Sequence, residues 1–132
     1  MTKVLAASYR AALLDNGVDL ISGNVKLYGM TASYTYSAAH DFLNDVTNIV
    51  YTSSNLTTKT AVDGAFDSDS ASASPAGGST ITQFWLALDS GVTSTSPLVY
   101  YFDEDAAAAA ISIATDGTAK TVDPGASGWF RV

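Results

Sequence analysis

STITQFWLALDSG, residues 79–91, is the stretch that decides the fold. Its bulky side chains Ile81, Phe84 and Trp85 lie between small turn-forming residues, a composition that favours a β-strand packed in a core. A second run, SPLVYYFDED at 96–105, is continuously apolar through its centre, which is typical of a strand covered on both faces. Two buried strands so close in sequence predict a mainly β protein.

Five more segments have β-branched or alternating apolar residues bounded by turn signals. Asp63-Gly64 marks a turn or bulge, and Asp116-Gly117 lies between two alternating arms, which is the best hairpin signal in the chain. We therefore expect an antiparallel β-sandwich of about seven short strands. The five further strand segments are 24–30, 47–53, 57–69, 111–122 and 127–132.

The N-terminal segment, residues 1–16, predicts a short helix packed at the edge of this sandwich. Thr2 can cap a helix that runs to about Asp15, and Asn16-Gly17 can end it, because glycine tolerates left-handed backbone geometry. The helical spacing of apolar residues is carried by Val4, Ala7, Ala11 and Leu14, with Leu5, Tyr9 and Leu13 close beside them.

Two segments do not fit the strand pattern. Residues 68–79 are small and polar, with Pro75 and Gly77-Gly78, and predict a mobile loop. Residues 103–110 place five alanines after an acidic start, but so few residues cannot form an independently stable helix, so we expect a loop or a single helical turn. Nothing else divides the chain, so residues 1–132 predict a single domain.

The composition excludes several classes of function. The net charge is −7, from six scattered basic and thirteen acidic residues, which argues against binding a nucleic-acid backbone. No cysteine is present, so disulfides, thiolate metal sites and thiol nucleophiles are excluded. No apolar run approaches the length of a membrane span or resembles a secretory signal. We expect a soluble protein, made in a cytoplasm, with no cofactor and no membrane partner.

His40 is the only histidine, and Asp41 follows it, a pair that invites a catalytic interpretation. Side chains of adjacent residues diverge, however, and no serine lies in a nucleophile-elbow motif, so a catalytic triad is not indicated. We expect no enzyme here. The alternative is a turn in which Ser37 or Asp41 caps and His40 at most forms a hydrogen bond. Apolar side chains then enter the core from Phe42, Leu43 and Val46.

Acidic residues gather at Asp67 and Asp69 and in the run 103–105. A calcium loop of the EF-hand type starting at Asp67 fails, because Ser72 and Gly78 occupy the positions that need glycine and glutamate. We therefore assign no metal ligand. Solvated turns are the expectation, and a calcium site assembled from separate loops stays an open alternative.

Aromatic side chains could form a sugar-binding platform, the sandwich core or the apolar centre of a protein interface. Core or interface is the more common use of such residues. The candidate interface residues are Tyr34, Tyr36, Tyr100 and Tyr101.

The order of segments along nearly the whole chain resembles a family of small structural proteins of tailed bacteriophages and prophages. The resemblance is carried by YRAALLDNGVDL, NVKLYGM, SYTYSAAHDFLNDVTNIV, LTTKTAVDGAFDSD, GGSTITQFWLALDSG, SPLVYYFDED and SGWFRV. These motifs are short and contain no catalytic residues. The chain departs from the family pattern at 70–74 and 106–110.

The resemblance implies a virion component assembled in the host cytoplasm, with no enzymatic activity. A capsid decoration (cement) protein that binds the major capsid protein is the first expectation, as a homo-oligomer on the outside of the head. A connector or tail component and a surface module that binds carbohydrate or a receptor remain alternatives.

Overall fold

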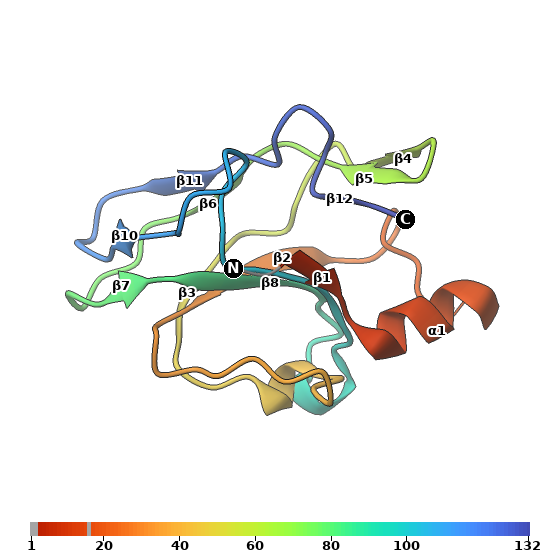
Figure 1. Ribbon diagram of the computed structural model, residues 1–132, viewed down its shortest axis with the longest axis horizontal. Coiled ribbons are helices and arrows are strands. Elements are labelled where there is room, and N and C mark those ends of the chain that lie inside the picture. Colours follow the sequence, from red (N-terminus) through yellow and green to blue (C-terminus); the bar gives the residue numbers. More distant parts are fainter. Residues whose placement is uncertain (1–2, 16) are drawn as a thin grey trace.

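A five-stranded antiparallel sheet forms the centre of the computed structural model, which describes residues 3–15 and 17–132 (Figure 1). β8 lies in the middle and pairs with β2 on one side and β9 on the other. The order across the sheet is β1 (Lys3–Leu5), β9 (Leu98–Phe102), β8 (Gln83–Leu88), β2 (Val25–Met30) and β3 (Ile49–Thr52).

Three small antiparallel sheets lie over one face of the central sheet, the upper face in Figure 1. They give the molecule the layered, sandwich-like arrangement expected from the sequence. The first pairs β7 (Thr80–Ile81) with β10 (Ile113–Ala114), and the second pairs β6 (Ala71–Ala73) with β11 (Lys120–Val122). The third has the order β12 (Phe130–Arg131), β5 (Ala65–Asp67) and β4 (Thr60–Val62).

Residues 31–48 and 89–97 cover the opposite face and appear below the sheet in Figure 1. Each contains a single turn of 3-10 helix, at Leu43–Asp45 (η1) and Thr93–Thr95 (η2). Leu43 and Val46 enter the core as expected, whereas the prediction for Phe42 is wrong, since its side chain is 39% exposed. Phe42 instead forms an isolated backbone bridge with Pro97.

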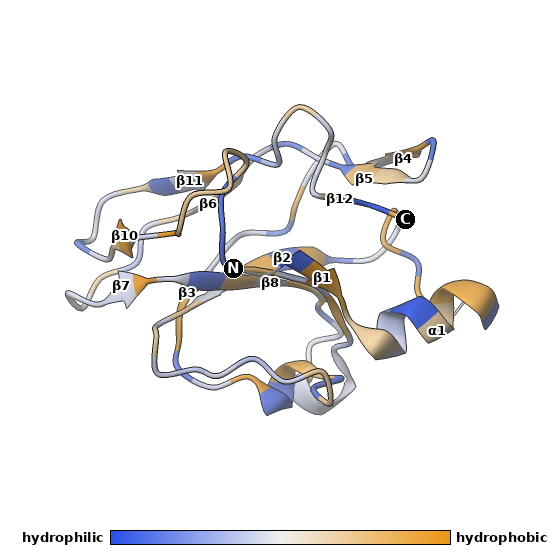
Figure 2. Cartoon of the chain, in the orientation of Figure 1, coloured by the Kyte–Doolittle hydropathy of each residue, from blue (hydrophilic) through white to orange (hydrophobic). Residues whose placement is uncertain are grey.

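The core is built on both faces of β8, which explains why its sequence dominates the fold. Phe84 stacks on Phe102 and meets Tyr51 edge-on, while Trp85 packs against Tyr101. In Figure 2 hydrophobic residues accordingly follow the central sheet. The strands predicted within 24–30, 47–53, 79–91 and 96–105 are confirmed as β2, β3, β8 and β9.

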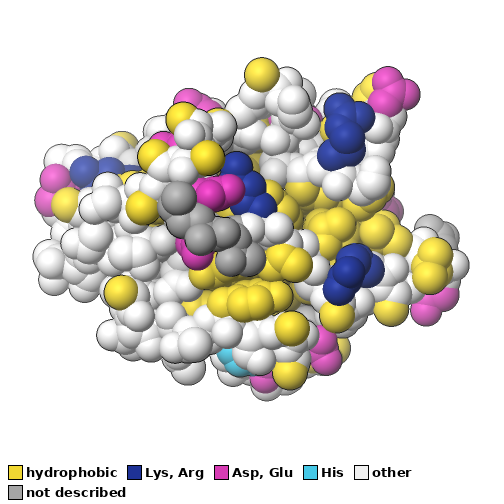
Figure 3. Space-filling view, viewed as in Figure 1, with side chains coloured by type: hydrophobic (Ala, Val, Ile, Leu, Met, Phe, Trp, Pro, Cys, Tyr) yellow, Lys and Arg dark blue, Asp and Glu magenta, His cyan; other side chains and the backbone are white. Residues whose placement is uncertain are grey.

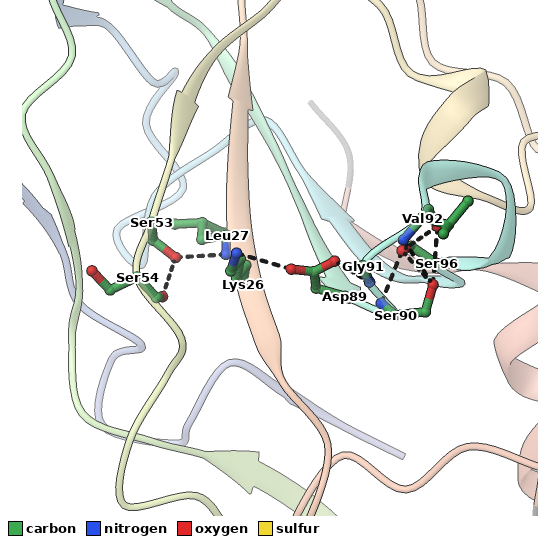
Figure 4. Close-up of polar contacts among 9 residues, drawn as sticks. All are labelled: Lys26, Leu27, Ser53, Ser54, Asp89, Ser90, Gly91, Val92 and Ser96. Carbon is green, nitrogen blue, oxygen red and sulfur yellow. Dashed lines mark hydrogen bonds and ion pairs between the residues drawn. The ribbon is translucent and has the colours of Figure 1, made fainter.

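Hydrogen bonds and an ion pair formed by polar side chains stabilise the ends of the strands (Figure 4). The buried Ser53 hydroxyl accepts a hydrogen bond from the backbone N–H of Leu27 at 2.9 Å, which ties the end of β3 to β2. Lys26 forms an ion pair of 2.9 Å with Asp89, and this contact, with the N–H of Gly91, lowers the pKa of the Asp89 carboxyl. Ser96 is fully buried and closes the η2 turn by donating to the carbonyl of Val92.

The N-terminal helix α1 spans Ala7–Asp15, as expected at its C-terminal end, but the prediction that it begins near Thr2 is wrong. Lys3–Leu5 form β1 instead, because their backbone extends the central sheet along β9. Thr2, the predicted cap, and Asn16 lie outside the described residues. The buried side chain of α1 is that of Tyr9, which lies beside the predicted apolar stripe and meets Phe130 edge-on, whereas Ala7, Ala11 and Leu14 of the stripe itself are exposed.

The hairpin predicted at 111–122 is wrong. Its two arms form β10 and β11, and these pair with β7 and β6 rather than with each other. The Asp116-Gly117 turn exists, with the N–H of Gly117 donating to the carbonyl of Pro75. By contrast, Asp63-Gly64 does connect a hairpin, between β4 and β5, with both residues at positive φ.

Residues 68–79 are not a loop throughout, since β6 occupies Ala71–Ala73 and buries Ala71. The alternation of small side chains there suits a short strand against β11. Residues 103–110 form a turn, as expected, in which the Asp105 carboxylate accepts hydrogen bonds from the N–H groups of Ala107 and Ala109. The described residues form twelve strands rather than about seven. Three predicted segments, 57–69, 79–91 and 111–122, each contain two strands, and β1 and β6 form where no strand was predicted.

Candidate functional site

Three of the four candidate interface tyrosines gather under the central sheet. Tyr36 lies between Trp85 and Tyr101, with ring centroids 6.0 and 4.6 Å away. Tyr34 and Tyr101 are buried, and burial is the main reason that the pKa of each hydroxyl is raised. Both therefore serve the core of this chain, which is one of the two uses expected for them.

Gln83 satisfies the polar atoms within this aromatic cluster. Its side-chain oxygen accepts a hydrogen bond of 2.6 Å from the Tyr101 hydroxyl. Its amide nitrogen donates to the backbone carbonyls of Thr31 and Tyr34. A buried polar side chain with three partners fixes the loop under the sheet, because each partner would lose its hydrogen bond if the loop moved.

Tyr100, the fourth candidate, lies on the opposite face of the sheet. Its half-buried ring packs against Phe102 and Phe130. Burial, followed by the negative charge of Glu104, raises the pKa of its hydroxyl. Tyr36 and Tyr100 are the two candidates that keep some exposed surface. They lie on opposite faces of the central sheet, so they do not form one shared patch.

The acidic candidates form turns. The Asp69 carboxylate accepts hydrogen bonds from the hydroxyls of Thr57 and Thr58, and Asp67 accepts one from the N–H of Ser68. Within the described ranges, no group of three or more His, Asp or Glu side chains is arranged to hold a metal ion.

An apolar groove of about 320 Å³ runs between α1, residues 18–21 and the three-stranded sheet; we call it the helix groove. Its floor is made of buried rings of Tyr9 and Phe130. Its edges are large apolar side chains that are partly exposed: Leu13 (41%), Ile21 (44%) and Val132 (63%). Leu14, next to Leu13, is almost fully exposed at the end of α1.

The two arginines of the chain lie on elements that form walls of the helix groove, although neither arginine is itself a lining residue. Arg10 lies on α1 and Arg131 on β12, and both are exposed. The ion pairs found among the described residues use Lys3, Lys26 and Lys120, so neither arginine belongs to one of them. Figure 3 shows the result, a hydrophobic area between α1 and β12 flanked by basic side chains.

A second hollow, of about 690 Å³, lies between the central sheet and the segment 121–129; we call it the aromatic cleft. Phe84, Tyr100, Phe102 and Trp129 line it, and small residues of 106–107 and 125–128 form its other walls. At its rim Lys3 lies 3.6 Å from the Glu104 carboxylate and donates to the carbonyl of Asp105.

Neither hollow was predicted from the sequence. Apolar spacing placed Leu14 in the same stripe as Val4, but spacing cannot tell which side of a short helix the rest of the chain covers. The only available signal was the crowding of apolar residues at 13–14, 18–21 and the C-terminus, which a sequence does not show to be adjacent.

The comparisons with known proteins add no relative: no family model, curated protein or solved structure matches this chain. Among the described residues, no helix has the length and apolar character that crossing a membrane requires.

Proposed function

We propose that this chain is a non-enzymatic structural protein of a tailed-phage virion, a capsid decoration protein that binds the outer surface of the head and stabilises it. Two independent supports favour this function. The segment order resembles phage structural proteins, and the helix groove offers a surface suited to protein contact.

The helix groove is the observation that carries the proposal. Isolated exposed hydrophobic residues are ordinary on soluble proteins. Here, however, Leu13, Ile21 and Val132 border one continuous hollow with aromatic rings at its floor. An apolar centre with a polar rim is the usual composition of a protein interface. Filling the groove with an apolar side chain of a partner would remove these three side chains from water.

The charges around the groove indicate the chemistry of that partner. The molecule carries a net charge of −7 and the groove lining includes Asp19, but the walls formed by α1 and β12 also carry the exposed Arg10 and Arg131. Arginine is enriched at interfaces because its planar guanidinium forms paired hydrogen bonds with carboxylates. We therefore expect the partner, the major capsid protein, to present an apolar projection flanked by acidic side chains.

Because many copies would bind the same shell lattice, weak individual contacts would be sufficient for stable attachment. When copies associate with one another as well as with the shell, each contact raises the effective concentration of the next. The proposal therefore includes a homo-oligomer at a local symmetry axis of the shell. Tyr36 is the candidate residue with surface left for such contacts, because Tyr100 lines the aromatic cleft.

The test is the copy number of this chain in purified particles, measured by quantitative mass spectrometry against the major shell protein. Hundreds of copies in a simple ratio to the shell subunit are the expected result. A handful to a few dozen copies would contradict decoration and indicate a connector or tail component. Absence of the chain from particles would overturn the virion proposal.

A further inference from the structure

The aromatic cleft lies beside the helix groove but has a different chemistry. Its volume of about 690 Å³ falls within the range of small-molecule sites, roughly 300–1,000 Å³. The proposed docking surface does not use it, so its function can be considered separately.

Four aromatic rings line the cleft in a continuous series. Phe84 stacks on Phe102 at 5.3 Å, and Tyr100 stacks on the same ring at 5.6 Å. Trp129 continues the series, with its ring centroid 6.3 Å from that of Phe102. The faces of aromatic rings are electron-rich, so this lining favours an apolar body and, over a ring face, a positive charge.

The rim of the cleft is acidic. Glu104, Asp105 and Asp123 line it, against the single ammonium group of Lys3. That ammonium already faces Glu104 and the Asp105 carbonyl, so the rim keeps an excess of two negative charges. The same field reaches the lining rings, since Glu104 contributes to the raised pKa of the Tyr100 hydroxyl. An anion entering the cleft would be repelled.

Small residues keep the space open. Ala106, Ala107 and Ala126 line the cleft with side chains no larger than a methyl group. Gly128 has φ +82, and a Cβ there would lie 2.5 Å from the carbonyl oxygen of Phe66, so this position holds the 125–129 turn close to β5. The turn is thus fixed by its own backbone rather than by side chains that would fill the cleft.

We propose that the aromatic cleft is a binding site for a small organic cation with an apolar body, of the benzylammonium kind. The body would lie against Phe102 and Trp129, and the charge would face the acidic rim. This site is separate from the proposed contact with the capsid, so either proposal can fail without the other.

The two tryptophans of the chain provide the reporter and its internal control. Trp129 lines the cleft, whereas the indole N–H of Trp85 donates to Tyr34 under the central sheet. We would titrate the full chain with benzyltrimethylammonium and follow both indole signals by ¹H–¹⁵N NMR, with Trp129→Phe to assign them. A saturable shift of the Trp129 signal alone is expected. Benzyl alcohol should bind more weakly, and benzoate should produce no saturable shift.

Five variants, two of them controls, test the mechanism. Glu104→Gln and Asp123→Asn should each weaken binding of the cation about two- to fivefold, since each removes one partly exposed charge, whereas Asp15→Asn on α1 should not. Ala106→Phe should fill the cleft and abolish binding. Ala109→Phe, in the same exposed turn but outside the lining, should leave it intact.

Three results would each overturn the proposal. The first is no saturable shift of Trp129 at millimolar cation, and the second is equal binding of benzoate. The third is binding that Ala106→Phe leaves unchanged while the NMR spectrum shows a folded chain.

Discussion

The hydroxyl of Tyr34 lies 2.7 Å from Nδ1 of His40 and 2.9 Å from Nε1 of Trp85. The indole N–H can only donate, so the Tyr34 oxygen accepts from Trp85, and the same hydroxyl also forms a hydrogen bond with the His40 ring. The only histidine of the chain fastens a loop to the buried centre of the sheet.

Tyr34→Phe should destabilise the fold by about 1–3 kcal/mol, because it leaves the buried Trp85 N–H without its acceptor. Chemical denaturation followed by far-UV circular dichroism would measure this. Tyr36→Phe is the matched control, since no hydrogen bond of the Tyr36 hydroxyl is found among the described residues and its ring contacts are retained. Equal losses in the two variants would show that the hydroxyl network contributes nothing specific.

His40→Ala should cost less, on the order of 1 kcal/mol, because His40 is half-buried and water can take its place beside the Tyr34 hydroxyl. The same denaturation experiment measures it, with the double variant Tyr34→Phe/His40→Ala completing a cycle. If the two losses simply add, the 2.7 Å contact is not energetically significant.

Gly29→Ala should destabilise the sandwich by about 1–3 kcal/mol through overpacking. A Cβ at this position would lie 2.9 Å from side-chain atoms of Ile81, Phe84 and Tyr51. Combining it with Ile81→Ala makes room for the new methyl group, so the double variant should lose less stability than the two single variants together. Full additivity in thermal unfolding would argue that Ile81 of β7 does not pack against the central sheet at Gly29.

The Asp116 carboxylate makes the stability of the turn before β11 depend on pH. Hydrogen bonds from the hydroxyl and N–H of Thr118, with the contact to Lys120, lower the pKa of Asp116 to about 2. The unfolded value is about 4, so this stabilisation is complete above that pH and is lost as pH falls towards 2. Asp116→Asn should reduce the change in unfolding free energy between pH 5 and about 2. Equal pH profiles for the wild type and Asp116→Asn would contradict this.

The sequence identified the strands that are buried on both faces, because their composition alone requires a core around them. It failed where the partner of a strand is distant. Asp116-Gly117 is a strong local turn signal, yet β10 and β11 pair with β7 and β6, whose backbones are brought close by the whole fold. Similarly, Lys3–Leu5 satisfied a helical spacing, and the pairing with β9 overrode it.

The candidate tyrosines illustrate the same limit for function. Composition could not separate Tyr101, which is buried beneath the sheet, from Tyr100, its neighbour, which faces the aromatic cleft. Successive strand residues point to opposite faces, so adjacent tyrosines have different surroundings. The helix groove was beyond sequence reasoning because its walls come from the N-terminal helix and the C-terminal strand.

Val132→Asp should weaken attachment to phage particles without unfolding the chain, if the helix groove is the docking surface. Val132 is 63% exposed at the edge of the groove, so a carboxylate there is solvated in the free protein but becomes buried in an interface. We expect at least a tenfold rise in the dissociation constant for particles that lack the protein, equivalent to about 1.4 kcal/mol. Co-sedimentation with such particles would measure it.

Val92→Asp is the matched control for that experiment. Val92 is similarly exposed, at 57%, but it precedes η2 and does not line the groove. Its replacement adds the same charge to a molecule that is already acidic, so general repulsion from the shell affects both variants alike. Only a loss that is larger for Val132→Asp supports docking through the groove. Equal losses of attachment in the two variants would indicate that the contact lies elsewhere on the surface. If both variants attach as well as the wild type, the groove is not part of the interface.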